Sequence, residues 1–225
     1  TTIYNLFLKG GNITNTAGYN LAVGEFALVN NTAGSSNVAL GYTSLYNSTG
    51  ISSSNTAIGN GSGRSITTGS GNVFVGDSSG FDASQKIDAE NSIAIGFQTY
   101  TTANNQVVLG NSNITETLLR GNVGIGTTTP RWLLQLATST APQLTLSDPT
   151  AGVSHWSFRN AGGNLYLATS SPSTFATNTT PMLTFNTSGG VGIRTASPLS
   201  SSALNIAVNA DSSTSANGIL MLGTT

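Results

Sequence analysis

A five-residue pattern of polar and apolar positions recurs along the first half of the chain. It consists of a polar residue, an apolar residue, a small residue, a second apolar residue and a closing glycine, as in Asn37-Val-Ala-Leu-Gly41. The copies occupy residues 20–24, 37–41, 55–59, 72–76, 92–96, 106–110 and, in a variant form, 122–126. The closing glycines lie 17, 18, 17, 20, 14 and 16 residues apart. Each copy predicts one short β-strand, because side chains alternate between the two faces of a strand, and the variable spacing is assigned to the loops.

The two faces of each predicted strand differ in the size of their side chains. We expect the larger aliphatic residues to form the core, namely Val23, Val38, Leu40, Ile58, Val75, Ile95 and Leu109. The opposite face carries a small residue at its centre, namely Ala22, Ala39, Ala57, Ala94 and Gly124. Small side chains let another backbone approach closely. We therefore expect the small-residue face to contact other copies of the chain.

The spacing of the copies is typical of the coils of a β-solenoid. A further apolar residue lies four positions after several closing glycines and suggests a second, weaker strand in each coil; these residues are Leu28, Leu45, Tyr100 and Ile114. A single coil cannot bury its apolar face alone, so coils stack and share a core. The sequence predicts an all-β protein that begins with a parallel β-roll or β-solenoid head over residues 1–118. Within it, we expect residues 82–90 to form a tolerant loop between coils.

The second half of the chain shows a different repeat. Gly121-Asn-Val-Gly-Ile-Gly-Thr-Thr-Thr-Pro130 returns 68 residues later as Gly189-Gly-Val-Gly-Ile-Arg-Thr-Ala-Ser-Pro198. Between these copies lie short alternating apolar runs separated by Gly and Asn turns, at residues 132–136, 143–146, 156–158, 164–167 and 182–185. We predict a junction at 119–130 and a small antiparallel β shaft unit at 131–188. Residues 189–225 are expected to hold a second junction and the start of another β unit, at 203–208 and 218–222.

Composition narrows the classes of function. Only 7% of the 225 residues are charged, and the formal net charge is −1. The chain has 7 Lys and Arg residues in total, and because they are scattered we expect no nucleic-acid partner. No apolar run is long enough for a membrane span, and the absence of Cys excludes thiolate chemistry. Since the chain opens on Thr1 and closes just after an apolar run, we expect an excerpt of a longer protein or a processed product.

Candidate chemistry is sparse. His155 is the sole histidine, and we interpret it as structural because it stands beside Trp156 in a predicted strand and no second histidine is present for a metal trio. The acidic residues Asp77, Asp82, Asp88 and Glu90 are interpreted as a solvated loop, with calcium binding or glycosidase chemistry as alternatives. The string 121–126 lacks the Lys-Ser or Lys-Thr of a phosphate loop. We therefore predict no catalytic residue, no cofactor and no metal site.

Two resemblances add to these expectations. The copies within residues 12–118 resemble the head repeats of YadA-like trimeric autotransporter adhesins, whose segments form a left-handed parallel β-roll. That resemblance implies a homotrimer with three rolls side by side. Residues 106–130 resemble the junction segments of many phage tail fibres and large bacterial surface proteins. Such chains often end in an intramolecular chaperone, which would lie downstream of Thr225.

Together, these features predict a structural and adhesive segment of a fibre that is extracellular, on a cell surface or on a virion. We expect it to be non-catalytic and self-associating, with a host surface receptor or a glycan as a candidate partner. The alternative is a carbohydrate-binding or carbohydrate-cleaving phage tail spike segment. The sequence leaves both a phage and a bacterial origin open.

Overall fold

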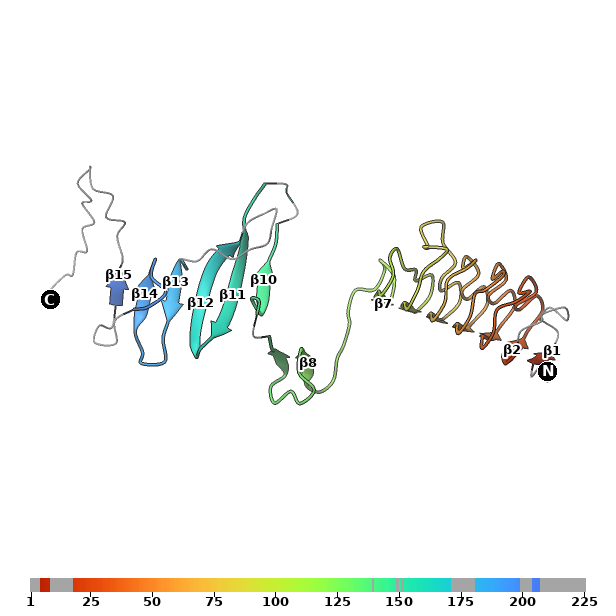
Figure 1. Cartoon of the computed structure of the whole chain (residues 1–225), viewed down its shortest axis with the longest axis horizontal. Helices are drawn as coiled ribbons and strands as arrows, with labels where there is room; N and C mark the ends of the chain where they lie inside the picture. Colours follow the sequence, from red (N-terminus) through yellow and green to blue (C-terminus); the bar gives the residue numbers. More distant parts are fainter. Residues whose placement is uncertain are drawn as a thin grey trace. The chain divides into compact units, whose positions relative to one another are not determined.

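The computed structural model describes residues 5–8, 18–138, 140–148, 150, 152–170, 181–198 and 204–206 (Figure 1). Every regular element in these residues is a β-strand, which confirms the all-β prediction. No helix with the length and apolarity of a membrane span occurs among them. The chain divides into two compact units, Thr1–Thr117 and Leu118–Thr225. Unit 1 and unit 2 are described separately below.

Unit 1 is one parallel sheet in which each strand pairs with the next along the chain. In Figure 1 its strand arrows lie side by side, joined by loops that repeat from coil to coil. The strand order is β1-β2-β3-β4-β5-β6-β7. The strands are β1 (Asn5–Leu8), β2 (Asn20–Val23), β3 (Val38–Leu40), β4 (Thr56–Ile58), β5 (Val73–Val75), β6 (Ile93–Ile95) and β7 (Val107–Leu109). This stack confirms the predicted β-solenoid, with the copies in register: Ala22 lies opposite Ala39, and Ala39 opposite Ala57.

Two details of the coils differ from the sequence-based expectation. Each coil has one strand, not two, because Leu28 and Leu45 lie in turns. Both are nevertheless buried, whereas Tyr100 and Ile114 are exposed. Strand β1 was missed because its copy, Asn5-Leu-Phe-Leu, is followed by Lys9 and not by glycine.

The predicted faces of the strands are reversed. Ala39, Ala57 and Ala94 are 0% exposed and belong to the core, whereas Leu40 is 44% and Leu109 55% exposed. The reason is that the space inside a coil is narrow. Where the turn contributes a buried leucine, as at Leu28 and Leu45, the strand can place only alanine against it.

Phe74 shows the opposite division of the inner space, with the large residue on the strand and small residues in the turns. Among strands β2–β6, it is the one large side chain at an inward position, and it is fully buried. The turns around it carry glycine where Leu45 stands in the preceding coil: a Cβ on Gly80 would lie 2.4 Å from the Phe74 ring, and one on Gly63 would lie 3.1 Å from it. The inner volume is therefore shared between strand and turn, and a large residue on one side requires a small one on the other.

The polar residue that opens each motif is buried and forms a ladder. The Asn37 side-chain Oδ1 accepts hydrogen bonds from the backbone N–H (2.9 Å) and the Nδ2 (3.3 Å) of Asn55. Asn55 repeats this with Asn72, at 3.0 and 3.1 Å. At the next coil, the Asn72 Oδ1 accepts from the backbone N–H of Ser92 at 3.0 Å. Each amide thus satisfies a backbone donor of the next coil, which fixes the register of the stack.

The closing glycine of each motif is required by its conformation and by contact with the next coil. Gly41 has a φ of +139°, which disfavours any residue with a Cβ. A Cβ there would lie 2.2 Å from the carbonyl oxygen of Gly59. Adjacent coils therefore meet backbone to backbone at this corner.

Unit 2 contains a two-stranded and a six-stranded sheet. The first pairs β8 (Val123–Ile125) with β9 (Leu134–Leu136) in parallel. The second has the order β10-β11-β12-β13-β14-β15 and is antiparallel except for the parallel pair β14–β15. Its strands are β10 (Leu144–Leu146), β11 (His155–Ala161), β12 (Asn164–Ser170), β13 (Leu183–Phe185), β14 (Val191–Ile193) and β15 (Leu204–Ile206). The predicted antiparallel β unit is therefore present, while the apolar run 218–222 lies outside the described residues.

The repeated junction has the same local structure in both copies. Its first strand pairs in parallel with a strand that follows the junction proline, as β8–β9 and as β14–β15. Gly124 and Gly192 occupy equivalent environments, because a Cβ on either would contact a Thr three residues later and the Pro six residues later. The sequence repeat is thus a structural repeat.

Candidate functional site

The outer face of the unit 1 sheet is aliphatic. We call it the outer aliphatic face and define it as the outward side chains of β2–β7, namely Leu21, Val23, Val38, Leu40, Thr56, Ile58, Val73, Val75, Ile93, Ile95, Val107 and Leu109. Leu40, Ile58, Ile95, Val107 and Leu109 are exposed, and the other members are half-buried. No charged residue occurs in these six strands. The solenoid therefore presents an apolar strip, two columns wide and six coils long, in which Thr56 is the one polar side chain.

A parallel sheet with one apolar face in water is unusual. All-parallel sheets occur almost only where both faces are covered. Large contiguous apolar patches on soluble proteins mark interaction sites. The coil spacing of about 4.8 Å makes the strip roughly 25 Å long. Its residues, taken for core in the sequence interpretation, are thus an interface candidate instead.

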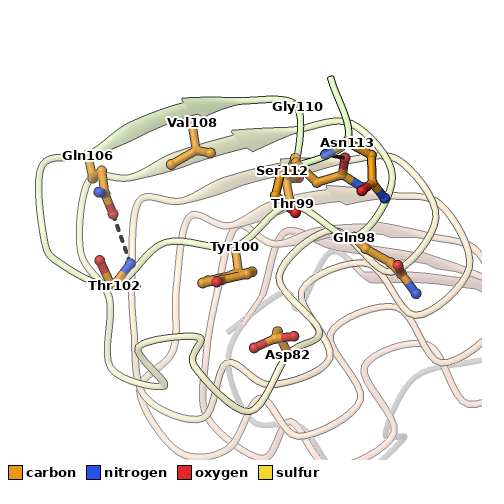
Figure 2. Close-up of a pocket in the computed structure, with 11 residues that line it drawn as sticks. Asp82, Gln98, Thr99, Tyr100, Thr102, Gln106, Val108, Gly110, Ser112 and Asn113 are labelled. Carbon is orange, nitrogen blue, oxygen red and sulfur yellow. Dashed lines mark hydrogen bonds between the residues drawn. The ribbon is translucent and has the colours of Figure 1, made fainter. Parts of the chain in front are cut away.

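A polar pocket of about 510 Å³ lies at the last two coils of unit 1 (Figure 2). Figure 2 shows the Tyr100 ring in the middle, with Asp82 below it, Gln106 and Thr102 on one side, and Gln98 and Asn113 on the other. Val108, Thr99, Gly110, Asn111 and Ser112 complete the lining. One aromatic ring is thereby surrounded by carboxylate, amide and hydroxyl groups.

Hydrogen bonds hold part of this lining in place. The Gln106 Oε1 accepts from the backbone N–H groups of Thr102 (2.8 Å) and Ala103 (3.3 Å). The Asn111 Nδ2 donates to the carbonyl of Phe97 at 2.9 Å. By contrast, the side-chain amides of Gln98 and Asn113 have no hydrogen-bond partner among the described residues. Both amides are therefore available to bind a ligand.

The acidic residues singled out in the sequence do not converge. Asp77 accepts hydrogen bonds from Ser78 (2.7 Å) and Asn60 (3.1 Å), which lower the pKa of its carboxyl group. Asp88 pairs with Lys86, and this contact lowers the pKa of Asp88. Asp82 lies in the pocket. Within the described ranges, no three His, Cys, Asp or Glu side chains are grouped closely enough to hold a metal ion.

The segment expected to be a tolerant loop is anchored in the coils. Gln85 is buried, and its Nε2 donates to the Thr101 hydroxyl at 3.0 Å while its Oε1 accepts from the Thr101 N–H at 2.9 Å. Ala89 is fully buried, and its carbonyl accepts from Asn72. The expectation of a freely removable loop over 82–90 is therefore corrected: deleting 82–88 would remove the Gln85 anchor.

His155 lies in β11, where it pairs with Ser170 of β12. It is 7% exposed, and the Ser170 hydroxyl donates to its backbone carbonyl at 3.4 Å. Its buried place at the start of β11 fits a structural side chain.

Comparison of the chain with protein-family models, with curated proteins and with solved structures finds no match. The assignment of function therefore depends on the geometry of this chain.

Proposed function

We propose that the chain is a non-catalytic, structural and adhesive segment of an extracellular or virion fibre, and that unit 1 assembles into a parallel homotrimer. The observation that carries the proposal is the outer aliphatic face. Its exposed side chains are costly to leave in water, at about 25 cal/mol for each Å² of apolar surface. A partner that covers it recovers that free energy.

A second copy of the same chain matches the coil-to-coil spacing of the side chains on this face. The aliphatic columns repeat once per coil because the strands are stacked in register. A parallel copy has the same repeat, so side chains of one coil can pack against those of the equivalent coil along the whole strip. In a threefold assembly, each copy contacts both of its neighbours around a common axis. The outer aliphatic face of every copy is then covered along its whole length. The resemblance to trimeric adhesin heads supports the same number.

The corrected orientation changes which residues belong to this interface. The alanines expected to mediate contact lie in the core, and the larger aliphatic residues replace them in the proposed contact. Since Leu40 is exposed and not part of the core, Leu40→Asp should leave the coil folded and weaken assembly.

The test is the solution mass of the wild-type chain and of the double variant Ile58→Asp, Ile95→Asp by light scattering. Both side chains are exposed on the outer aliphatic face. We expect threefold mass for the wild type and a lower mass for the variant, because pairing would bury uncompensated carboxylates. Ile87→Asp is the control, since Ile87 is exposed outside the strands. A wild-type chain that is monodisperse and monomeric at micromolar concentration would refute the trimer.

A further inference from the structure

A second surface of unit 1, separate from the outer aliphatic face, carries a row of aromatic side chains. We call it the aromatic row and define it as Phe26, Tyr42, Tyr46, Arg64, Phe81 and Tyr100. These residues lie in the segments that follow the closing glycines, not in the strands. The proposed trimer contact therefore does not use them.

Contacts run along this row from coil to coil. The Phe26 ring meets Tyr42 edge to face at 6.0 Å and Tyr46 at 6.5 Å between centroids. The Arg64 guanidinium lies 5.5 Å from the Tyr46 ring centroid and 4.6 Å from that of Phe81. In the next coil, the Gly80 N–H donates to the Thr99 carbonyl at 2.6 Å, so the backbone segments that carry Phe81 and Tyr100 are neighbours. Tyr100, the last member of the row, lines the polar pocket.

The pocket and the row together have the chemistry that binds a sugar. A pyranose presents an apolar C–H face and a rim of hydroxyl groups. The exposed ring of Tyr100 offers an apolar surface for such a face. Asp82 accepts hydrogen bonds, and the amides of Gln98 and Asn113 both donate and accept. A volume of about 510 Å³ suits one or two sugar rings.

Charge favours a neutral glycan. Asp82 is the only charged residue in the lining of the pocket, so the carboxylate of an acidic sugar would meet a like charge there. The single carboxylate also favours binding over cleavage, because glycosidases usually act with a pair of carboxyl groups. The other rings of the row, at Phe26, Tyr42, Tyr46 and Phe81, provide further surfaces for an extended chain.

We propose that the pocket around Tyr100, extended by the aromatic row, binds a neutral glycan chain. This inference deepens the proposed function, since it supplies the partner for an adhesive fibre and depends on that function for its biological role. The binding itself is independent of assembly, because the glycan surface and the outer aliphatic face share no residue.

The test uses the full chain, fluorescently labelled, on an array of neutral and acidic oligosaccharides, followed by titration of the best neutral oligosaccharide. We expect binding to neutral members and at least about tenfold weaker binding for Tyr100→Ala, with Tyr100→Phe close to wild type. Asp82→Asn, which keeps the shape of the side chain, should also weaken binding. Phe97→Ala is the matched control, because Phe97 is exposed on the same coil but outside the pocket lining.

Three results would overturn the inference: no binding on the array, binding to acidic members alone, or undiminished binding by both Tyr100→Ala and Asp82→Asn. Circular dichroism of each variant identifies misfolding, and the near-isosteric Asp82→Asn keeps the test decisive if Tyr100→Ala unfolds. Light scattering on the same samples separates the two proposals. A monomer that binds glycan refutes only the trimer, and a trimer that binds none refutes only the glycan site.

Discussion

The two units use the same short, glycine-bounded strands but differ in how they bury apolar side chains. In unit 1, the inward residues of β2–β6 are fully buried. In unit 2, Ala168 is the single hydrophobic residue classed as buried in the described part, while Trp132, Leu133, Leu146 and Trp156 are exposed. Stacking accounts for the difference, because each coil covers the core of the coil before it.

A single-layer sheet has no such cover. It needs a second layer against at least one face to be stable in water. The exposed tryptophans and leucines of unit 2 therefore indicate that its covering surface comes from outside the described part of the unit. In the proposed fibre, the neighbouring chains would provide it, and unit 2 would depend on assembly more strongly than unit 1.

Separating the units should have the largest effect. A chain of residues 1–117 should unfold in one cooperative thermal transition followed by circular dichroism, because it contains the whole core cluster. A chain of residues 118–225 should show no cooperative transition on its own. A monomeric 118–225 chain that melts cooperatively would show that unit 2 has a sufficient core and would invalidate the comparison.

Substitution at a closing glycine should be the next largest effect. Gly41→Ala places a Cβ at a φ of +139° and 2.2 Å from a backbone oxygen of the next coil. We expect a loss of about 3 kcal/mol or more in the free energy of unfolding, measured with urea. Gly50→Ala is the control: its φ is +58°, but a Cβ there meets no atom within 4 Å. It should cost only about 1 kcal/mol.

Removal of one amide from the ladder should be somewhat milder. Asn55→Ala takes away the acceptor for the backbone N–H and the Nδ2 of Asn72. Leaving buried donors unsatisfied should lower the free energy of unfolding by about 2–3 kcal/mol. Asn60→Ala provides a matched comparison, because the Asn60 amide makes an exposed hydrogen bond with Asp77, and its loss should stay within about 0.5 kcal/mol. Equal losses for both variants would argue against the ladder as the determinant of register.

Acid should produce the smallest effect, and it should distinguish the units. Hydrogen bonds from Ser78 and Asn60 lower the pKa of Asp77 below 3.8, so the stability they contribute is present above that pH. It is lost as pH falls through the lowered pKa of the folded state. Melting temperatures recorded from about pH 5 to about pH 2 should fall less steeply for Asp77→Asn than for the wild type.

The corresponding carboxylate in unit 2 supplies the control. Asp148 also has a lowered pKa, caused chiefly by its hydrogen bond with Thr150. If the cooperative transition belongs to unit 1, Asp148→Asn should leave the acid dependence unchanged. A change as large as that of Asp77→Asn would place unit 2 within the same cooperative transition.

The period, the parallel stacking and the register of unit 1 could be predicted from the sequence, because they follow from the recurring motif. The direction of the two strand faces could not. Alternation of Ala39 with Leu40 shows that two faces exist, but which one points inward depends on the width of the coil. One signal in the sequence was that residue size on the strand and in the turn vary inversely. Phe74 stands on the strand where the turns carry Gly63 and Gly80 in place of a larger residue. Tryptophan at Ala39 or Ala57 should accordingly disrupt the coil itself.

The ladder and the pocket were harder to infer. Asparagine is usually exposed, so only its recurrence at residues 20, 37, 55 and 72 hinted at a stacked, buried row. The pocket combines Asp82, Tyr100 and Asn113 from three loops of unequal length. Because the irregular spacing of these loops has no period, the sequence did not show that these residues meet.

The in-register stacking of unit 1 has a mechanical consequence. The hydrogen bonds that join coils, such as the 2.8 Å bond from the Val38 N–H to the Asn55 carbonyl, run along the stacking direction. Tension applied between the first and last coil would load these layers in series, so the weakest layer opens first and the others stay closed. Each freed coil of 17 residues lengthens the chain by up to about 60 Å. Under load, the stack would extend in discrete steps, and each step would dissipate part of the mechanical work done on the chain.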